Sequence, residues 1–201
     1  MQRHLDDPYV RQARQSGYRS RSSFKLKEMD ERYRLFAPGM TVVDLGAAPG
    51  GWSQVAVEKV SVDGKLKEGQ IIALDILSME PINGVEFIQG DFEETEVLKQ
   101  LVGILGNTSV DLVISDIAPN LSGIRAVDQA KSTGLVELVL NFADQYLTEG
   151  GVLLAKCFEG EGISLIREEF RKRFRKVVNF KPKSSRDASR EIYLIGLYYV
   201  K

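Results

Sequence analysis

The chain alternates short apolar runs with segments in which apolar residues recur at helical spacing. The runs are nearly continuous in valine, isoleucine and leucine, and they cover residues 41–45, 70–75, 85–89, 110–115 and 151–158. Parallel strands have this composition because both of their faces are buried. Between the runs, the spacing predicts amphipathic helices over residues 52–60, 95–105 and 127–147. The alternation predicts an α/β protein with a doubly wound, mostly parallel sheet.

Both ends of the chain depart from this alternation. Near the start, a basic arm precedes one helical stripe of apolar residues, formed by Leu26, Met29, Tyr33 and Phe36. Near the end, the apolar run 191–200 follows the run 176–180 after a connection too short for a crossover helix. A parallel neighbour needs a longer connection, so the last strand is predicted to run antiparallel.

Length and composition indicate one globular domain over residues 1–201, with a basic arm and helix in 1–36 and the sheet in 37–201. No apolar run approaches the roughly 20 residues that span a bilayer, and residues 1–15 lack the apolar core of a secretory signal. Cys157 is the only cysteine, which excludes an internal disulfide and a multi-cysteine metal site. We therefore expect a cytoplasmic protein without a bound metal.

The net charge of −1 argues against a nucleic-acid-binding protein, but the distribution of charge argues for one. Residues 8–27 contain no acidic side chain, yet they include Arg11, Arg14, Arg19, Arg21, Lys25 and Lys27. A second basic tract within residues 167–190 includes Arg171, Lys172, Arg173, Arg175, Lys176, Lys181, Lys183 and Arg186. Either tract alone is typical of a solvated surface, whereas two of them beside a nucleotide-binding type of sheet favour contact with phosphates.

A glycine-rich turn joins the first predicted strand, which contains Asp44, to the next helix. Its residues Gly46, Ala47, Pro49, Gly50, Gly51 and Trp52 are the first candidates for binding a ligand. Glycine permits positive φ and close approach to a ligand, and open α/β sheets bind ligands beyond the carboxyl end of this strand. The spacing is not G-x-G-x-x-G, and Pro49 lacks the N–H that a pyrophosphate would accept. A ligand without phosphates is therefore favoured.

Polar residues also follow the other predicted strands. Asp75 with Ile76, and Asp91 with Phe92, end the second and third strands, where the acids could bind ribose hydroxyls and an adenine amino group. Asp116 ends the fourth strand. Lys156 lies in the apolar fifth strand, and Glu191 begins the antiparallel last strand at the same edge of the sheet. A lysine in such a run is hard to explain by packing alone.

The chain resembles the FtsJ-like ribose 2′-O-methyltransferases in several segments that occur in order over nearly its whole length. These segments are residues 19–26 (RSRSSFKL), 44–52 (DLGAAPGGW), 115–123 (SDIAPNLSG), 156–160 (KCFEG) and 184–193 (SSRDASREIY). Ser23, where relatives often carry a bulkier residue, and the long loop 61–69 are the departures. The resemblance implies a Rossmann-like methyltransferase fold, S-adenosylmethionine as cofactor, and a catalytic tetrad of Lys25, Asp116, Lys156 and Glu191. Within the family it is most similar to bacterial members that methylate a uridine ribose in large-subunit (23S) ribosomal RNA.

The chemistry of a ribose hydroxyl suits this tetrad. A free lysine has a pKa near ~10.4 and is mostly charged, but burial and a second cation can lower a lysine pKa, while carboxylates oppose that shift and orient the amine. We expect Lys156 to be the general base and Lys25 to tune it and hold the nucleotide, with Asp116 and Glu191 orienting both amines.

Other functions fit the sequence less well. Amino-directed base methyltransferases carry Asp/Asn-Pro-Pro-aromatic after the fourth strand, which residues 116–120 lack. Carbon-5 cytosine chemistry needs a cysteine nucleophile, whereas Cys157 should face away from Lys156 into the core. The glycine spacing of a nicotinamide oxidoreductase is absent from this chain. A 2′-O-methyltransferase of transfer RNA or an mRNA cap, and a non-catalytic RNA-binding ribosome assembly factor, stay open as alternatives. We expect a monomer bound to ribosomal RNA, without a membrane partner.

Overall fold

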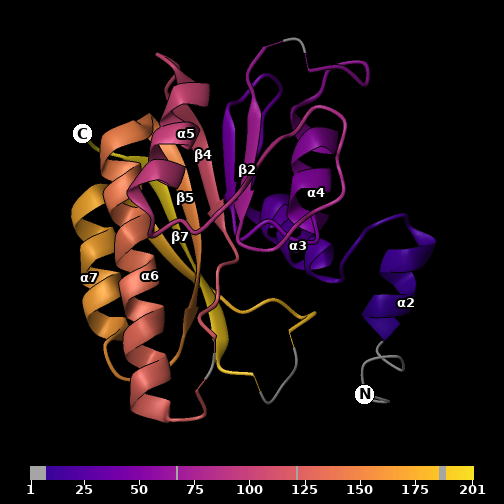
Figure 1. Cartoon of the computed structure of the whole chain (residues 1–201). Helices are drawn as coiled ribbons and strands as arrows, with labels where there is room; N and C mark the ends of the chain where they lie inside the picture. Colours follow the sequence, from indigo (N-terminus) through magenta and orange to yellow (C-terminus); the bar gives the residue numbers. More distant parts are fainter. Residues whose placement is uncertain (1–7, 67, 121, 186–188) are drawn as a thin grey trace.

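The computed structural model describes residues 8–66, 68–120, 122–185 and 189–201. Within these residues, seven strands form one sheet in the order β3-β2-β1-β4-β5-β7-β6 (Figure 1). The strands are β1 (Val42–Leu45), β2 (Ile71–Asp75), β3 (Glu86–Gln89), β4 (Val110–Ser115), β5 (Leu147–Phe158), β6 (Phe174–Phe180) and β7 (Glu191–Tyr199). Strands β1 to β5 pair in parallel, and β7 is antiparallel to both β5 and β6. The predicted fold class and the antiparallel last strand are confirmed, and β7 inserts between β5 and β6.

Helices cover both faces of the sheet (Figure 1). They are α2 (Pro8–Gln15), α3 (Ser22–Tyr33), α4 (Gly51–Val60), α5 (Thr95–Leu105), α6 (Arg125–Tyr146) and α7 (Ile163–Arg173). One core contains side chains of α5, α6 and α7 and one face of the strands, and a second core contains α3, α4 and the other face. Helix α2 stands apart from the sheet and reaches α3 through the rings of Tyr9 and Phe24, whose centroids are 6.1 Å apart. No helix in the described ranges is long and apolar enough to cross a membrane.

Two helices lie where the pattern predicted none. Helix α2 lies in the basic arm, and α7 overlaps the start of the second basic tract. In α7 the apolar signal was present, because Ile163, Ile166 and Phe170 are buried in the core, but the charged residues around them obscured it. The predicted helices 52–60, 95–105 and 127–147 agree with α4, α5 and α6 to within two residues.

The order of the strands creates the site for a ligand. The chain passes from β1 outward to β2 and β3, then returns to β4 on the other side of β1. The connections beyond the carboxyl ends of β1 and β4 therefore diverge, and in open α/β sheets such a switch point leaves a crevice that binds ligands.

Candidate active site

The glycine turn after β1 depends on backbone that other residues rarely adopt. Gly46 has a φ of 78°, and a Cβ placed on it would lie 2.7 Å from the backbone nitrogen of Ile117, in the loop after β4. Gly50 has a φ of 107° immediately before α4. The two glycines therefore let the turn pass close to the β4 loop and open directly into a helix.

Asp75 connects this turn to the end of β2. Its Oδ2 accepts the backbone N–H of Ala48 at 2.9 Å, and its Oδ1 accepts that of Leu77 at 2.8 Å. Asp91, beyond β3, accepts the N–H of Glu93 through Oδ1 at 2.9 Å. The backbone contacts orient both carboxylates, and each retains lone pairs that a ligand hydroxyl or amino group can use.

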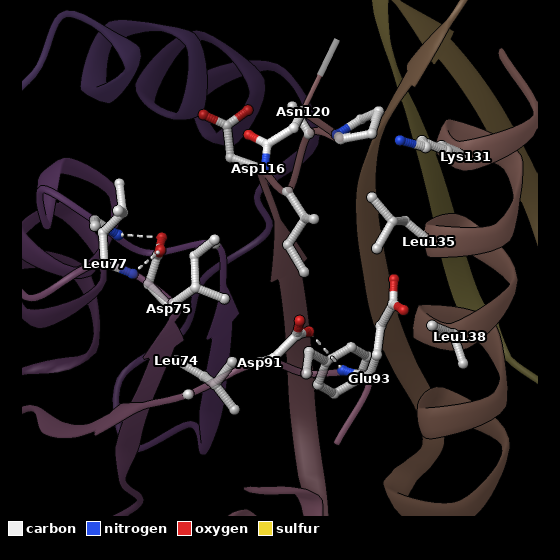
Figure 2. Close-up of a pocket in the computed structure, with 18 of the residues that line it drawn as sticks. Leu74, Asp75, Leu77, Asp91, Glu93, Asp116, Asn120, Lys131, Leu135 and Leu138 are labelled. Carbon is white, nitrogen blue, oxygen red and sulfur yellow. Dashed lines mark hydrogen bonds between the residues drawn. The ribbon is translucent and has the colours of Figure 1, made fainter. Parts of the chain in front are cut away.

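A cavity of about 870 Å³ lies beyond these strand ends. Six of the predicted cofactor-binding residues line it: Gly46, Asp75, Ile76, Asp91, Phe92 and Asp116. In Figure 2, Asp75 and Asp91 come from the strand ends, and a wall from α6 with Lys131, Leu135 and Leu138 faces them. The α6 wall was not predicted, because the apolar stripe of that helix gave no sign of which side chains face a ligand. Carboxylates dominate the charged lining, so the cavity suits a cationic ligand better than a polyphosphate.

The other predicted cofactor-binding residues, Ala47, Pro49, Gly50, Gly51 and Trp52, do not line this cavity. The start of α3 and the residues just before it cover the start of α4: a Cβ placed on Gly51 would clash with the Oγ of Ser20, and the Trp52 indole donates to the Ser22 carbonyl at 2.9 Å. Ser23, the departure from the resembled pattern, is fully buried here and donates to the Gly51 carbonyl at 3.1 Å. These residues shape the turn and attach it to the N-terminal helix.

The four predicted catalytic residues lie in two ion pairs at the rim of the sheet. Lys25 of α3 donates to Glu191 Oε1, with side-chain exposures of 9% and 16%. Lys156 of β5 donates to the backbone carbonyl of Asp116 and, at 3.1 Å, to its Oδ1. Asp116 also lines the cavity, so the cavity and the tetrad share one carboxylate.

Tyr193, for which the sequence predicted no role, joins the two ion pairs. It lies opposite Lys156 in the β5–β7 register, and its hydroxyl donates to Asp116 Oδ1 at 2.8 Å and accepts from the Lys25 ammonium at 3.4 Å. Burial, together with the negative charges of Asp116 and Glu191, raises the pKa of Tyr193 well above its ordinary value, so the hydroxyl stays protonated. A signal was available, because Tyr193 follows Glu191 by two residues and therefore shares its face of the strand.

Glu191 is held as a carboxylate. Burial raises its pKa, but the charge of Lys25, the hydrogen bond from that ammonium and the charge of Lys156 together keep the pKa below its ordinary value. Glu191 Oε1 also lies 3.2 Å from the hydroxyls of Ser185 and Tyr193. The group is therefore anionic and oriented from several sides.

Beneath the turn, Asp44 is a buried acid with an incomplete set of partners. Its Oδ2 accepts from the Ser53 hydroxyl at 2.6 Å, while no described residue donates to its Oδ1. Burial raises the pKa of Asp44 to about 7, the Ser53 hydrogen bond opposes the rise, and the charges of Asp116 and Asp75 add to it. Asp44, Asp75 and Asp116 thus lie around the glycine turn after β1.

Cys157 faces the core as predicted. The thiol is buried on the face of β5 away from the tetrad, and burial raises its pKa to about 12. A thiolate nucleophile is therefore unavailable, which disfavours carbon-5 cytosine chemistry.

The first basic tract divides between surface and site. Arg11 and Arg14 are exposed on α2, whereas Lys25 belongs to the tetrad. Lys27 donates to the Tyr18 hydroxyl at 3.0 Å, and the guanidinium of Arg19 is bonded to backbone carbonyls. Among these, Arg11 and Arg14 present their charge to solvent.

The second basic tract does not form one face with the tetrad. Strand β6 runs from Phe174, beside Tyr199, to Phe180, beside Tyr193 at the rim. Arg175 and Lys176 therefore lie toward the other end of the strand, four to five residues from that rim and roughly 13–17 Å from it at about 3.3 Å per residue. Within α7, Lys172 and Arg173 both pair with Glu169. Lys181 and Lys183 follow β6 at the rim, and Arg186 lies outside the described residues, as do Leu121 and the other residues of 186–188.

Known proteins resemble this chain over nearly its whole length. The family described as FtsJ-like methyltransferase matches residues 18–199. A protein of Methylobacillus flagellatus named Ribosomal RNA large subunit methyltransferase E is 52% identical over 98% of this chain and 93% of its own length. A protein of the same name from Chromohalobacter salexigens is 53% identical over 98% of this chain and 91% of its own length. A crystal structure from Plasmodium falciparum, described as a ribosomal RNA methyltransferase, is 31% identical with a TM-score of 0.80, covering 90% of this chain and 98% of that one.

Proposed function

The chain belongs to the FtsJ-like methyltransferase family, and on that premise we propose that it transfers a methyl group from S-adenosylmethionine to the ribose 2′-hydroxyl of a uridine in large-subunit ribosomal RNA. The observation that carries the proposal is the position of Asp116, which lines the cavity and also accepts hydrogen bonds from Lys156 and Tyr193. A ligand in the cavity and a nucleotide at the tetrad would therefore lie side by side.

The residues of the cavity fit S-adenosylmethionine. Asp75 and Asp91 offer oriented carboxylates to a ribose diol and an adenine amino group, and Ile76 and Phe92 offer apolar surface to the base. When bound, the cofactor would supply a methyl group on a positively charged sulfur; attack of the ribose oxygen on the methyl carbon would break the carbon–sulfur bond and release the sulfur as a neutral thioether. The surrounding carboxylates favour that charge.

Lys156 is the proposed general base. Once deprotonated, the amine would retain its two hydrogen bonds, to the carbonyl and the carboxylate of Asp116, and its lone pair would accept the proton of the ribose hydroxyl. Asp116 then stabilises the ammonium that forms. Lys25, held by Glu191, is proposed to position the nucleotide and to act as the second cation that lowers the pKa of Lys156. Tyr193 is proposed to hold the two ion pairs in place relative to each other, through its hydrogen bonds to Asp116 and Lys25.

The names of the relatives support ribosomal RNA as the substrate. The exposed arginines of α2, together with Lys181 and Lys183 at the rim, are the proposed phosphate contacts. We further propose that the protein acts as a monomer in the cytoplasm.

The test is a map of methylated riboses in large-subunit RNA from cells that lack the protein. We expect one 2′-O-methyluridine to disappear and to return when the wild-type gene, but not the Lys156→Ala variant, is restored. Nucleoside analysis separates ribose from base methylation in the same samples.

Each alternative gives a different pattern. Loss of a methylated ribose from transfer RNA or from an mRNA cap would move the substrate within the same chemistry. Full rescue by Lys156→Ala, with the methylated riboses unchanged throughout, would indicate a non-catalytic assembly factor and contradict the proposal.

A further inference from the structure

Arg19 belongs to the basic arm by sequence, yet its guanidinium is hydrogen-bonded to three backbone carbonyls. Its Nη1 donates to the carbonyl of Glu80 at 2.5 Å and to that of Pro49 at 3.3 Å, and its Nη2 donates to the carbonyl of Pro81 at 2.8 Å. Pro49 belongs to the glycine turn, and Glu80 and Pro81 belong to the loop of residues 76–84 between β2 and β3. One guanidinium therefore joins the N-terminal segment to two loops of the cofactor site.

The loop of residues 76–84 carries part of the cavity. Ile76 and Leu77 line the cavity with exposures of 54% and 63%, so a ligand there would cover apolar side chains that now face solvent. Regular secondary structure is absent from these residues, all of which are described. Their position thus depends on contacts with other segments.

Gly50 is where this loop meets the glycine turn. A Cβ placed on Gly50 would lie 2.7 Å from Ile82 Cδ1, 2.8 Å from Met79 Sδ and 3.1 Å from Arg19 Nη1. The loop and the turn are therefore in close contact, and the guanidinium of Arg19 lies at the edge of that contact.

The backbone around Arg19 is fixed in turn by α4. The side chain of Gln54 accepts the N–H of Arg19 at 2.9 Å and donates to the carbonyl of Gly17 at 3.0 Å. Both sides of the segment are thus attached to the helix that begins at the glycine turn.

We propose that Arg19 is a positioning residue of the cofactor site, whose guanidinium holds the loop of residues 76–84 against the glycine turn and thereby sets the affinity for the cofactor. The inference rests on the proposed binding of S-adenosylmethionine in the cavity. Arginine suits this task because its planar fork donates to several acceptors at once, whereas lysine offers a single point charge.

Calorimetric titration with S-adenosylhomocysteine tests the proposal without any need for RNA. Arg19→Ala should weaken binding roughly tenfold or more, since hydrogen bonds from a charged donor are lost. The affinity of Arg19→Lys for S-adenosylhomocysteine should be closer to that of Arg19→Ala than to that of the wild type. The matched control is Arg32→Ala, which removes an arginine that contacts Tyr33 and Phe180 away from these loops and should bind like wild type.

Kinetics and hydrogen exchange separate positioning from a general loss of structure. In Arg19→Ala the KM for S-adenosylmethionine should rise while kcat at saturation stays near wild type, as expected when binding energy alone is lost. Amide exchange should accelerate in residues 76–84 more than elsewhere. Should Arg19→Ala fail to fold, Gln54→Ala loosens the same segment and should produce the same effects in smaller measure.

Several results would overturn the inference. Unchanged cofactor affinity in Arg19→Ala, or full affinity in Arg19→Lys, would show that the clamp is not needed. A loss confined to RNA affinity and its salt dependence would make Arg19 a phosphate contact instead. If the wild-type protein itself bound no S-adenosylhomocysteine, the proposed function would fail first, and the two failures are therefore distinguishable.

Discussion

Replacing Lys156 tests whether the tetrad performs proton transfer. Lys156→Ala removes an amine whose side chain is 9% exposed and which donates twice to Asp116. Tyr193 still donates to the Asp116 carboxylate at 2.8 Å, so the carboxylate keeps an oriented partner. The loss of unfolding free energy should therefore fall below the roughly 3–5 kcal/mol typical of a broken buried pair. The protein should fold and bind S-adenosylhomocysteine.

The expected loss in rate is much larger than the loss in binding. General-base catalysis contributes about 10²–10⁴-fold, so single-turnover methylation by Lys156→Ala should fall by at least ~100-fold. Lys156→Arg keeps the charge and the pairing with Asp116, but a guanidinium cannot be deprotonated in a protein. It should be nearly as inactive as alanine. Lys99→Ala, at an exposed lysine of α5, is the control and should retain the wild-type rate.

The assay is single-turnover transfer of a labelled methyl group to large-subunit RNA, with cofactor and RNA affinities measured separately. If Lys156→Arg retained most of the wild-type rate, proton abstraction by Lys156 would be refuted. The lysine would then act as an electrostatic clamp on the ribose, and the methyltransferase assignment would stand with a different mechanism.

Asp75→Ala should weaken S-adenosylhomocysteine binding more than Asp91→Ala does, because Asp75 also holds the glycine turn; equal, wild-type affinity of both folded variants by calorimetry would remove the cofactor assignment. Replacing Arg11 and Arg14 together by alanine should weaken RNA binding and flatten its salt dependence by about two phosphate contacts, with cofactor affinity intact; an unchanged slope would exclude α2 as the contact. Because the pKa of Asp44 is raised to about 7 in the fold, above the ~3.9 of an unfolded chain, its protonation favours the folded state as pH falls. Wild type should therefore gain about 2–3 kcal/mol relative to Asp44→Asn between about pH 8 and pH 5 in urea unfolding, and a constant difference would contradict the buried-charge explanation.

The local pattern of apolar and polar residues was sufficient to predict most of the sheet and the direction of its strands. Continuous apolar runs predicted parallel strands, and the short connection before Glu191 predicted the antiparallel strand that pairs with β5. The direction of the strands then predicted that Asp116, Lys156 and Glu191 lie at one edge of the sheet, since an antiparallel strand begins at the edge where the parallel strands end. These features could be predicted because both signals are local in the sequence. The apolar composition of a strand buried on two faces and the length of a connection each depend on residues that are neighbours along the chain.

The tertiary structure decided which side chains meet. Lys25 and Glu191 are 166 residues apart, and no periodicity relates them; only the packing of α3 on the sheet brings them together, and Lys25 entered the site from the family resemblance alone. The role of Tyr193 depends on the register of β7 against β5, which sets its hydroxyl between two ion pairs. In the sequence, Arg19 is one more positive charge of the basic arm; only the structure shows that its guanidinium donates to the carbonyls of Glu80 and Pro81. A hydrogen bond requires its partners within about 3 Å, and such proximity between distant segments is a property of the packed chain, not of its local sequence.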